Sequence, residues 1–213
     1  MSDEKSYSRK SFFGEFFSLV KKGVANQIDR KLGRMLEAPI RPPGALDEVE
    51  FLSACTRCDA CLKACPVNAV KTVSIHGGVG AGTPFIDPSA QACVLCPDFP
   101  CISVCEPGAL LPLPVHEVRM GVAVVDESAC QTYDDRVCSL CYDACPFPET
   151  AITIDEHFHP KVLEGCVGCG LCQQYCPFSP VGIQCRSPLF HQTEKIENDL
   201  YFGLFKKDES QDP

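Results

Sequence analysis

One cysteine motif is repeated four times along the chain, and it constrains the fold more than any other feature. Each copy holds three closely spaced cysteines and then, after three intervening residues, a fourth. A proline follows the fourth cysteine directly in three of the copies. The copies are Cys55, Cys58, Cys61 and Cys65; Cys93, Cys96, Cys101 and Cys105; Cys130, Cys138, Cys141 and Cys145; and Cys166, Cys169, Cys172 and Cys176.

This spacing is typical of [4Fe–4S] cluster ligation. The first and fourth copies match the bacterial Cys-x2-Cys-x2-Cys-x3-Cys-Pro pattern, and the other two lengthen one interval. In that pattern three cysteines bind irons of one cluster, while the fourth reaches a neighbouring cluster. Each cluster therefore draws on two motifs. The sequence predicts four [4Fe–4S] clusters, with these sixteen cysteines as the iron ligands.

Other uses of cysteine fit the pattern less well. Zinc sites use paired Cys-x2-Cys hooks that converge on one ion. Seventeen cysteines in 213 residues approaches the density of a disulfide scaffold, but such scaffolds belong to exported chains. Every motif keeps four cysteines, so nothing indicates a [3Fe–4S] cluster. The seventeenth, Cys185, is predicted to be a small buried residue rather than a ligand or a redox thiol.

Short apolar stretches flank the motifs and predict strands. They follow the motifs at residues 69–70, 109–111, 151–154 and 181–183, and precede the last three at 84–87, 122–126 and 160–163. We expect an α+β fold of two tandem or nested bacterial-ferredoxin-like dicluster modules, with short strands and helices around the cysteine loops. The expected division is residues 1–44 (amphipathic helix and proline-rich linker), 45–185 (four-cluster domain) and 186–213 (tail).

The N-terminal segment carries an apolar stripe. Phe13, Phe16, Phe17 and Val20 recur at three- and four-residue spacing, which predicts an amphipathic helix packed on its own domain, a partner subunit or the inner face of a membrane. Residues 8–13 resemble a weakened twin-arginine export motif, but charged residues interrupt the apolar stretch that export needs. We expect a cytoplasmic protein, with periplasmic export as the alternative. No run of 18 apolar residues predicts a transmembrane helix.

The net charge and the remaining motifs disfavour several classes of function. The net charge of −9, made more negative by bound clusters, disfavours nucleic-acid binding and favours basic surfaces on redox partners. The glycine-rich residues 77–82 lack the Lys-Ser/Thr of a phosphate loop, so we expect a flexible loop. His157 and His159 are expected to be exposed turn residues rather than metal ligands. In motif two the proline is displaced by one residue, to Pro107, which is either harmless or a change in the solvation of one cluster.

Three functions remain open. The first is an electron carrier or electron-transfer subunit between a donor and an acceptor protein, without catalysis of its own. The second is an enzyme, but no nucleophile–base pair and no flavin or nicotinamide fingerprint supports it. The third is a module in which clusters only hold the fold.

Residues 41–184 resemble the MauM/NapG-type ferredoxins, polyferredoxins of periplasmic nitrate reductase and methylamine dehydrogenase gene clusters. The matching pieces lie at residues 41–45, 51–55, 82–85, 108–110, 120–123 and 165–170. The resemblance implies four [4Fe–4S] clusters and a relay between a quinol-oxidising membrane partner and a terminal reductase. The chain departs from that family in its incomplete twin-arginine signal.

The motif order also resembles the four-cluster subunits of molybdopterin oxidoreductases. That resemblance implies a nested pairing, in which motif one pairs with four and motif two with three. Cys176 then completes the site of motif one, Cys65 that of motif four, Cys145 that of motif two and Cys105 that of motif three. Pairing of one with two and three with four is the open alternative.

Overall fold

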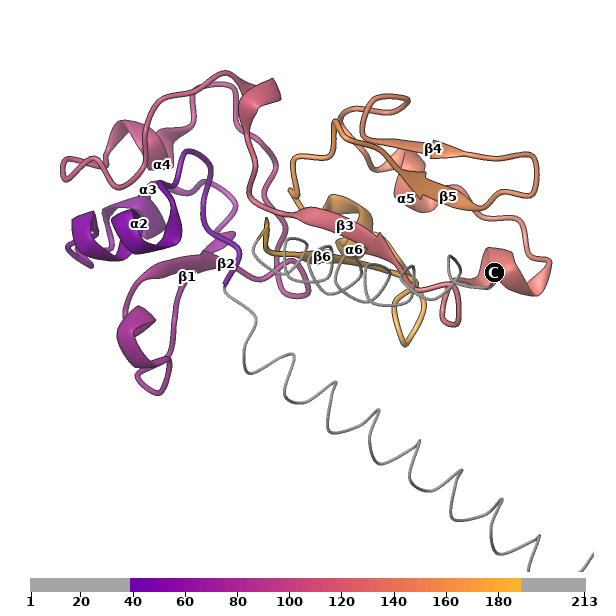
Figure 1. The fold of residues 1–213 in the computed structure, drawn as a ribbon, viewed down its shortest axis with the longest axis horizontal. Helices are drawn as coiled ribbons and strands as arrows, with labels where there is room; N and C mark the ends of the chain where they lie inside the picture. Colours follow the sequence, from indigo (N-terminus) through magenta and orange to yellow (C-terminus); the bar gives the residue numbers. More distant parts are fainter. Residues whose placement is uncertain (1–38, 189–213) are drawn as a thin grey trace, which may run out of the picture. The chain divides into compact units, whose positions relative to one another are not determined.

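The computed structural model describes residues 39–188, which form two halves of similar plan (Figure 1). The first half is residues 39–113 and the second half is residues 122–188, and each contains two cysteine motifs. The predicted N-terminal helix and nearly all of the predicted tail lie outside the described residues and stay predictions. Across residues 39–188, no helix has the length and apolar character needed to cross a membrane.

The first half wraps its two cysteine motifs around a short hairpin. Its elements are α2 (Glu48–Ala54), α3 (Ala60–Ala64), β1 (Val70–Thr72), η1 (Gly78–Gly80), β2 (Pro84–Ile86) and α4 (Pro100–Ser103). Strands β1 and β2 pair antiparallel, with Val70 opposite Ile86. The segment before motif one lies antiparallel to the segment after motif two, through a bridge between Ala45 and Leu110. Motifs one and two are therefore brought together.

The second half repeats this plan. After the linker turn η2 (Val115–Glu117) come β3 (Val122–Val125), η3 (Gln131–Asp134), α5 (Leu140–Asp143), β4 (Ile152–Ile154), β5 (Pro160–Val162), α6 (Leu171–Gln174) and β6 (Ile183–Arg186). Strands β4 and β5 form a hairpin between motifs three and four. Strand β3, before motif three, pairs antiparallel with β6, after motif four (Figure 1).

A short helix carries the third cysteine of every motif. Cys61 lies in α3, Cys101 in α4, Cys141 in α5 and Cys172 in α6. In motif one the helix ends at Ala64, and the backbone of the next residue, Cys65, is extended. Because Cys65 leaves the helical path, its side chain separates from that of Cys61 and can serve a different site.

The buried cores of the halves differ in size. One cluster of thirteen buried residues is centred on the first half, with Phe51, Ile86 and Ile102 among its members. It also takes in Val167 and Cys169 from the second half. The core that belongs to the second half alone has three buried residues: Ala123, Ile152 and Ile183.

Arg41 anchors the start of the first half. Its buried guanidinium donates to both carboxylate oxygens of Glu48, at 2.9 and 2.5 Å, and to Thr83 Oγ1 at 2.8 Å. It also lies over the ring of Phe51, 4.6 Å from the centroid, where the ring's quadrupole attracts a cation. The proline-rich residues 42–43 are thereby tied to α2 and to the start of β2.

Strands form at six of the seven predicted stretches. The exception is residues 109–111, which form a single bridge rather than a strand. Leu111 still donates its N–H to Gly44 O at 2.7 Å, but Pro112 and Pro114 follow. Because proline has no N–H, the ladder cannot continue. The glycine-rich residues 77–82 form η1 and adjoining hydrogen-bonded turns, with Gly80 N–H donating to Gly77 O.

Candidate metal centres

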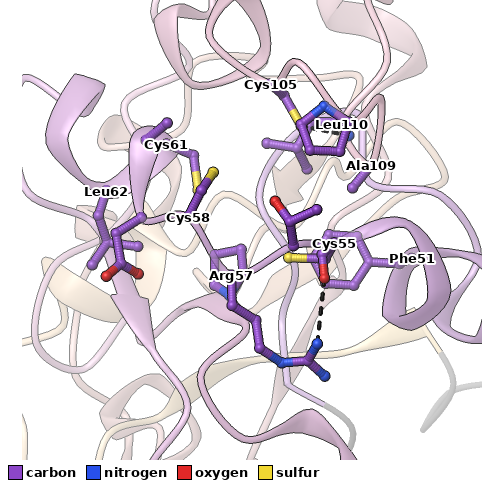
Figure 2. A pocket seen from close by; sticks show the side chains of 14 residues that line it. Phe51, Cys55, Arg57, Cys58, Cys61, Leu62, Cys105, Ala109 and Leu110 are labelled. Atoms are coloured by element: carbon purple, nitrogen blue, oxygen red, sulfur yellow. Dashed lines mark hydrogen bonds between the residues drawn. The ribbon is translucent and has the colours of Figure 1, made fainter.

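Four cavities are each lined by four cysteines of the repeated motifs, three from one motif and the fourth from another. The spaces are of similar size, between about 350 and about 390 Å³ including their mouths. Figure 2 shows the sulfur atoms of cavity A around a common space. We name them cavity A (Cys55, Cys58, Cys61, Cys105), cavity B (Cys65, Cys93, Cys96, Cys101), cavity C (Cys145, Cys166, Cys169, Cys172) and cavity D (Cys130, Cys138, Cys141, Cys176).

These cavities contradict the nested pairing of motifs. Motif one exchanges its fourth cysteine with motif two, so Cys105 completes cavity A and Cys65 completes cavity B. Motifs three and four exchange Cys145 and Cys176 in the same way. The reason lies in the strand pairing, because each half closes on itself and places its own two motifs side by side.

The cysteine arrangement fits a cluster better than a single ion. Within residues 39–188, no three His, Cys, Asp or Glu side chains converge as the ligands of one metal ion. A zinc ion needs four ligand atoms about 2.0–2.3 Å from one point. Four thiols spread around a larger space instead suit the several irons of a cubane, whose ligands are four cysteine thiolates.

Backbone N–H groups donate to sulfur at equivalent places. Ala69 N–H donates to Cys65 Sγ at 3.2 Å, Leu110 N–H to Cys105 Sγ at 3.4 Å and Gly182 N–H to Cys176 Sγ at 3.4 Å. Each donor lies four to six residues after a motif's fourth cysteine. Hydrogen bonds to sulfur stabilise its negative charge and help to set cluster potentials.

A proline lines each cavity. Pro66 lines cavity B, Pro146 cavity C and Pro177 cavity D, each directly after a fourth cysteine. Pro107 lines cavity A although it is displaced by one residue along the chain. The position of this proline in space is therefore kept, which supports the interpretation of the shift as harmless.

Burial raises the pKa of several cavity thiols. The pKa of Cys93 rises to about 12, and those of Cys61, Cys101 and Cys169 rise to about 11, in each case mainly through loss of hydration. At neutral pH these thiols are protonated whenever no iron is bound to them. Iron ligation releases those protons, because the bound metal charge compensates the buried thiolates.

Comparison with known proteins shows which family the chain belongs to. A family described as a 4Fe-4S dicluster domain matches residues 54–109. The ferredoxin-type protein NapG of Escherichia coli is 36% identical over 168 residues, 72% of this chain and 73% of NapG. The methylamine utilization ferredoxin-type protein MauM of Methylobacillus flagellatus is 37% identical over 156 residues, 68% of this chain and 67% of MauM. The chain belongs to the NapG/MauM family of ferredoxin-type proteins.

Family membership confirms the resemblance that the motifs indicate. Together with the cysteine-lined cavities, it makes the chain an iron–sulfur protein that transfers electrons. The ferredoxin-type protein NapF of E. coli is also similar, at 32% identity over 67% of this chain and 82% of NapF. No solved structure matches the chain.

In this NapG/MauM-type protein, Arg57 is one of the residues that line cavity A. It lies between Cys55 and Cys58 with a left-handed backbone, at φ +59°. Its side chain donates to Ala81 O at 3.0 Å, to Val79 O at 3.1 Å and to Cys55 O at 3.4 Å, the last drawn in Figure 2. Arg57 thereby fastens the glycine-rich loop to the motif-one loop. Sequence reasoning missed this role because nothing in the motif distinguishes Arg57 from an exposed basic residue.

Cys185 lines cavity C together with the four motif cysteines. Its thiol donates to Gly168 O at 3.1 Å, and its N–H donates to Gln173 Oε1 at 2.7 Å. Burial raises its pKa, so the thiol stays neutral at physiological pH. The sequence predicts a buried residue, whereas Cys185 is only partly buried, and its position on a cavity wall had no signal in the sequence.

The two turn histidines have different surroundings. The side chain of His157 is 72% exposed, as expected of a turn residue. That of His159 is 26% exposed, because its ring stacks on Tyr133 with centroids 4.0 Å apart. Asp155 accepts hydrogen bonds from both backbone N–H groups and so closes the turn between β4 and β5. His159 thus packs η3 against this hairpin.

Proposed function

We propose that the chain is an electron relay with four [4Fe–4S] clusters, one in each of cavities A–D, ligated by the sixteen motif cysteines. One observation carries this proposal. Each cavity is lined by three cysteines of one motif and the fourth cysteine of the motif beside it. That is the ligand exchange by which two-cluster ferredoxins hold their clusters. When bound, the clusters supply one-electron chemistry.

Each half is then a dicluster module, and the two modules are in tandem. The family match at residues 54–109 supports this for the first half. For the second half the support is its equivalent strand pairing and its two cavities. With the flanking segments, this gives the division into residues 1–44, 45–185 and 186–213.

A relay is favoured over clusters that only hold the fold, because one ligand reaches the surface. Cys58 of cavity A is exposed, whereas the other sixteen cysteines are buried or partly buried. An exposed ligand shortens the distance to a partner's redox centre. A purely structural cluster gains nothing from such exposure and becomes more open to oxidation.

The partners are redox proteins that deliver and remove electrons, and the chain acts as a carrier subunit without catalysis of its own. Following the family resemblance, we place it between a quinol-oxidising membrane partner and a terminal reductase. Residues 1–44 are the candidate contact to that partner. The proposed location is the cytoplasmic face of the membrane, and the periplasm is the alternative.

Anaerobic redox titration tests this function. The protein should take up about four electrons per chain from dithionite, one for each cluster. An oxidising partner protein, added by rapid mixing, should then remove these electrons again. Clusters that bind iron yet take up no electrons would support a structural role. Turnover of a substrate by the isolated chain would point to an enzyme.

A further inference from the structure

The two halves meet in a packed contact. Val167 and Cys169, from the motif-four loop, belong to the same buried core as Ile86 and Leu95 of the first half. Met120, at the end of the linker, donates its N–H to Val167 O at 3.1 Å. The motif-four loop is therefore held against the first half, whereas none of the motif-three cysteines belongs to this core.

Three hydrogen bonds cross this contact beside the cysteines, one of them from Gln91 Nε2 to Gln174 Oε1 at 3.5 Å. Cys93, which lines cavity B, donates its N–H to the carbonyl oxygen of Cys169, which lines cavity C, at 3.0 Å. One residue earlier, Ala92 donates its N–H to Gln174 Oε1 at 2.7 Å. Ala92 is fully buried, so its N–H has no access to water as a substitute partner.

We propose that this contact is the crossing point for electrons between the halves, with Cys93 and Cys169 as the two sides and Gln174 as the residue that positions them. The inference rests on the proposed function, because it requires clusters in cavities B and C. A ligand of one cluster then connects to a ligand of the next through a single peptide hydrogen bond. The electron therefore does not need an additional, longer step through space.

The order of electron transfer therefore differs from the order of the motifs in the sequence. Cavities A and B are linked within the first half through α3, which carries Cys61 of cavity A and is capped at its C-terminus by Cys65 of cavity B. Cavities C and D are linked through α5, which carries Cys141 of D and ends at Asp143, two residues before Cys145 of C. The path runs A–B–C–D, so motif four precedes motif three.

Each step along this path moves one electron. A reduced cluster on one side is oxidised as an oxidised cluster on the other side is reduced, and no bond forms or breaks. Gln174 does not contact either cluster in this account. It fixes Ala92, and through Ala92 it sets the approach of Cys93 to Cys169.

Gln174→Leu tests the positioning role, with two matched variants. Leucine removes the acceptor for the Ala92 N–H, while Gln174→Glu keeps an acceptor oxygen and should rescue. Gln173→Leu is the control, because Gln173 is the adjacent residue of α6 and accepts from Cys185 within the second half. The readout is the spin–spin splitting in the electron paramagnetic resonance spectrum of the reduced full-length protein, with iron content measured in parallel.

We expect Gln174→Leu to keep its iron but to lose or reduce the splitting between the clusters of B and C, with wild-type splitting in Gln174→Glu and Gln173→Leu. Equal loss in Gln173→Leu, or no loss in Gln174→Leu, would overturn the positioning role.

Should Gln174→Leu fail to fold, substitutions of single ligands test the order of the clusters along the path. Cys172→Ser, which disables C, should remove the part of the splitting of the cluster of B that comes from C and leave the part that comes from A, and Cys138→Ser, which disables D, should leave both parts. The reverse result would overturn the path, whereas a wild-type protein without four clusters would refute the proposed function itself.

Discussion

The two halves of the chain share a strand pattern but differ in what holds that pattern together. The first half closes with a single bridge, yet it has a large apolar core and the partly buried Arg41–Glu48 ion pair. The second half closes with the regular β3–β6 ladder, but its own core has only three buried residues. The same ligand geometry can therefore rest on apolar packing or on backbone pairing.

This difference predicts where the clusters matter most for stability. Apolar burial contributes about 25 cal/mol per Å² removed from water, so a three-residue core stabilises the second half only slightly. Metal binding to a site absent from the unfolded chain adds its free energy to folding. The second half should therefore depend more strongly on its clusters than the first.

Removal of iron should give the largest effect. After anaerobic chelation of the full-length protein, we expect β3, β4, β5 and β6 to lose nearly all amide protection, while α2 and β2 keep part of theirs. Hydrogen exchange read by mass spectrometry gives both values in one sample, with the untreated protein as control. Simultaneous loss in both halves would contradict the comparison.

Arg41→Met should give the next largest effect. It leaves the Glu48 carboxylate, Thr83 and the Pro84 carbonyl without their buried donor, and loss of one partner of such a pair costs about 3 kcal/mol. The control is Lys161→Met in the second half, because Lys161 is exposed and its ion pair with the partly buried Asp155 is worth about 1 kcal/mol or less. Denaturant unfolding of both variants measures the difference, and equal losses would show that Arg41 does not stabilise the first half in this way.

Two glycines test how each half closes, and Gly44 alone also has a positive φ, of +76°, that strains any side chain placed there. A Cβ added at Gly44 would collide with Leu111 O, and one added at Gly121 would collide with Arg186 O, so both alanine variants force the closing segments apart. We expect losses of about 2 kcal/mol, typical of overpacking. Gly121→Ala should release iron mainly from cavities C and D, because the second half has only a small apolar core to keep its fold once the β3–β6 ladder is forced apart.

Gly44→Ala should release less iron, and mainly from cavities A and B, since the larger core and Arg41 still hold that half. Iron analysis after a fixed incubation with a chelator distinguishes the two variants. Greater release from Gly44→Ala than from Gly121→Ala would reverse the comparison.

Cys185→Ser should give the smallest effect. Cavity C already has four motif cysteines, and serine keeps a donor for Gly168 O. We expect unchanged iron content and at most a small change in the spectrum of one cluster. Loss of about one quarter of the iron would show that Cys185 replaces one of the four motif cysteines as a ligand.

Local features of the chain could be predicted from the sequence. The cysteine spacing of each motif can be read from a few neighbouring residues. The short, valine-rich stretch at residues 122–126 likewise predicts a strand by itself. The stretch at 109–111 looked similar, but Pro112 removes the N–H that a longer ladder needs.

Long-range features could not be predicted in this way. The identity of the cysteine that completes each cavity depends on the closure of each half, which joins residues far apart in the sequence. The analogy with a nested arrangement therefore gave the wrong partner for Cys65 and Cys105. Arg41 and Gln174 are likewise recognised only by the groups they meet, since either side chain would suit an exposed position.

The central claim is that all four cavities hold a [4Fe–4S] cluster, and elemental analysis of the anaerobically purified full-length protein tests it most directly. The account predicts about sixteen iron and about sixteen acid-labile sulfide ions per chain. A protein that contains zinc without labile sulfide, or only about eight iron ions per chain after full reconstitution, would contradict it.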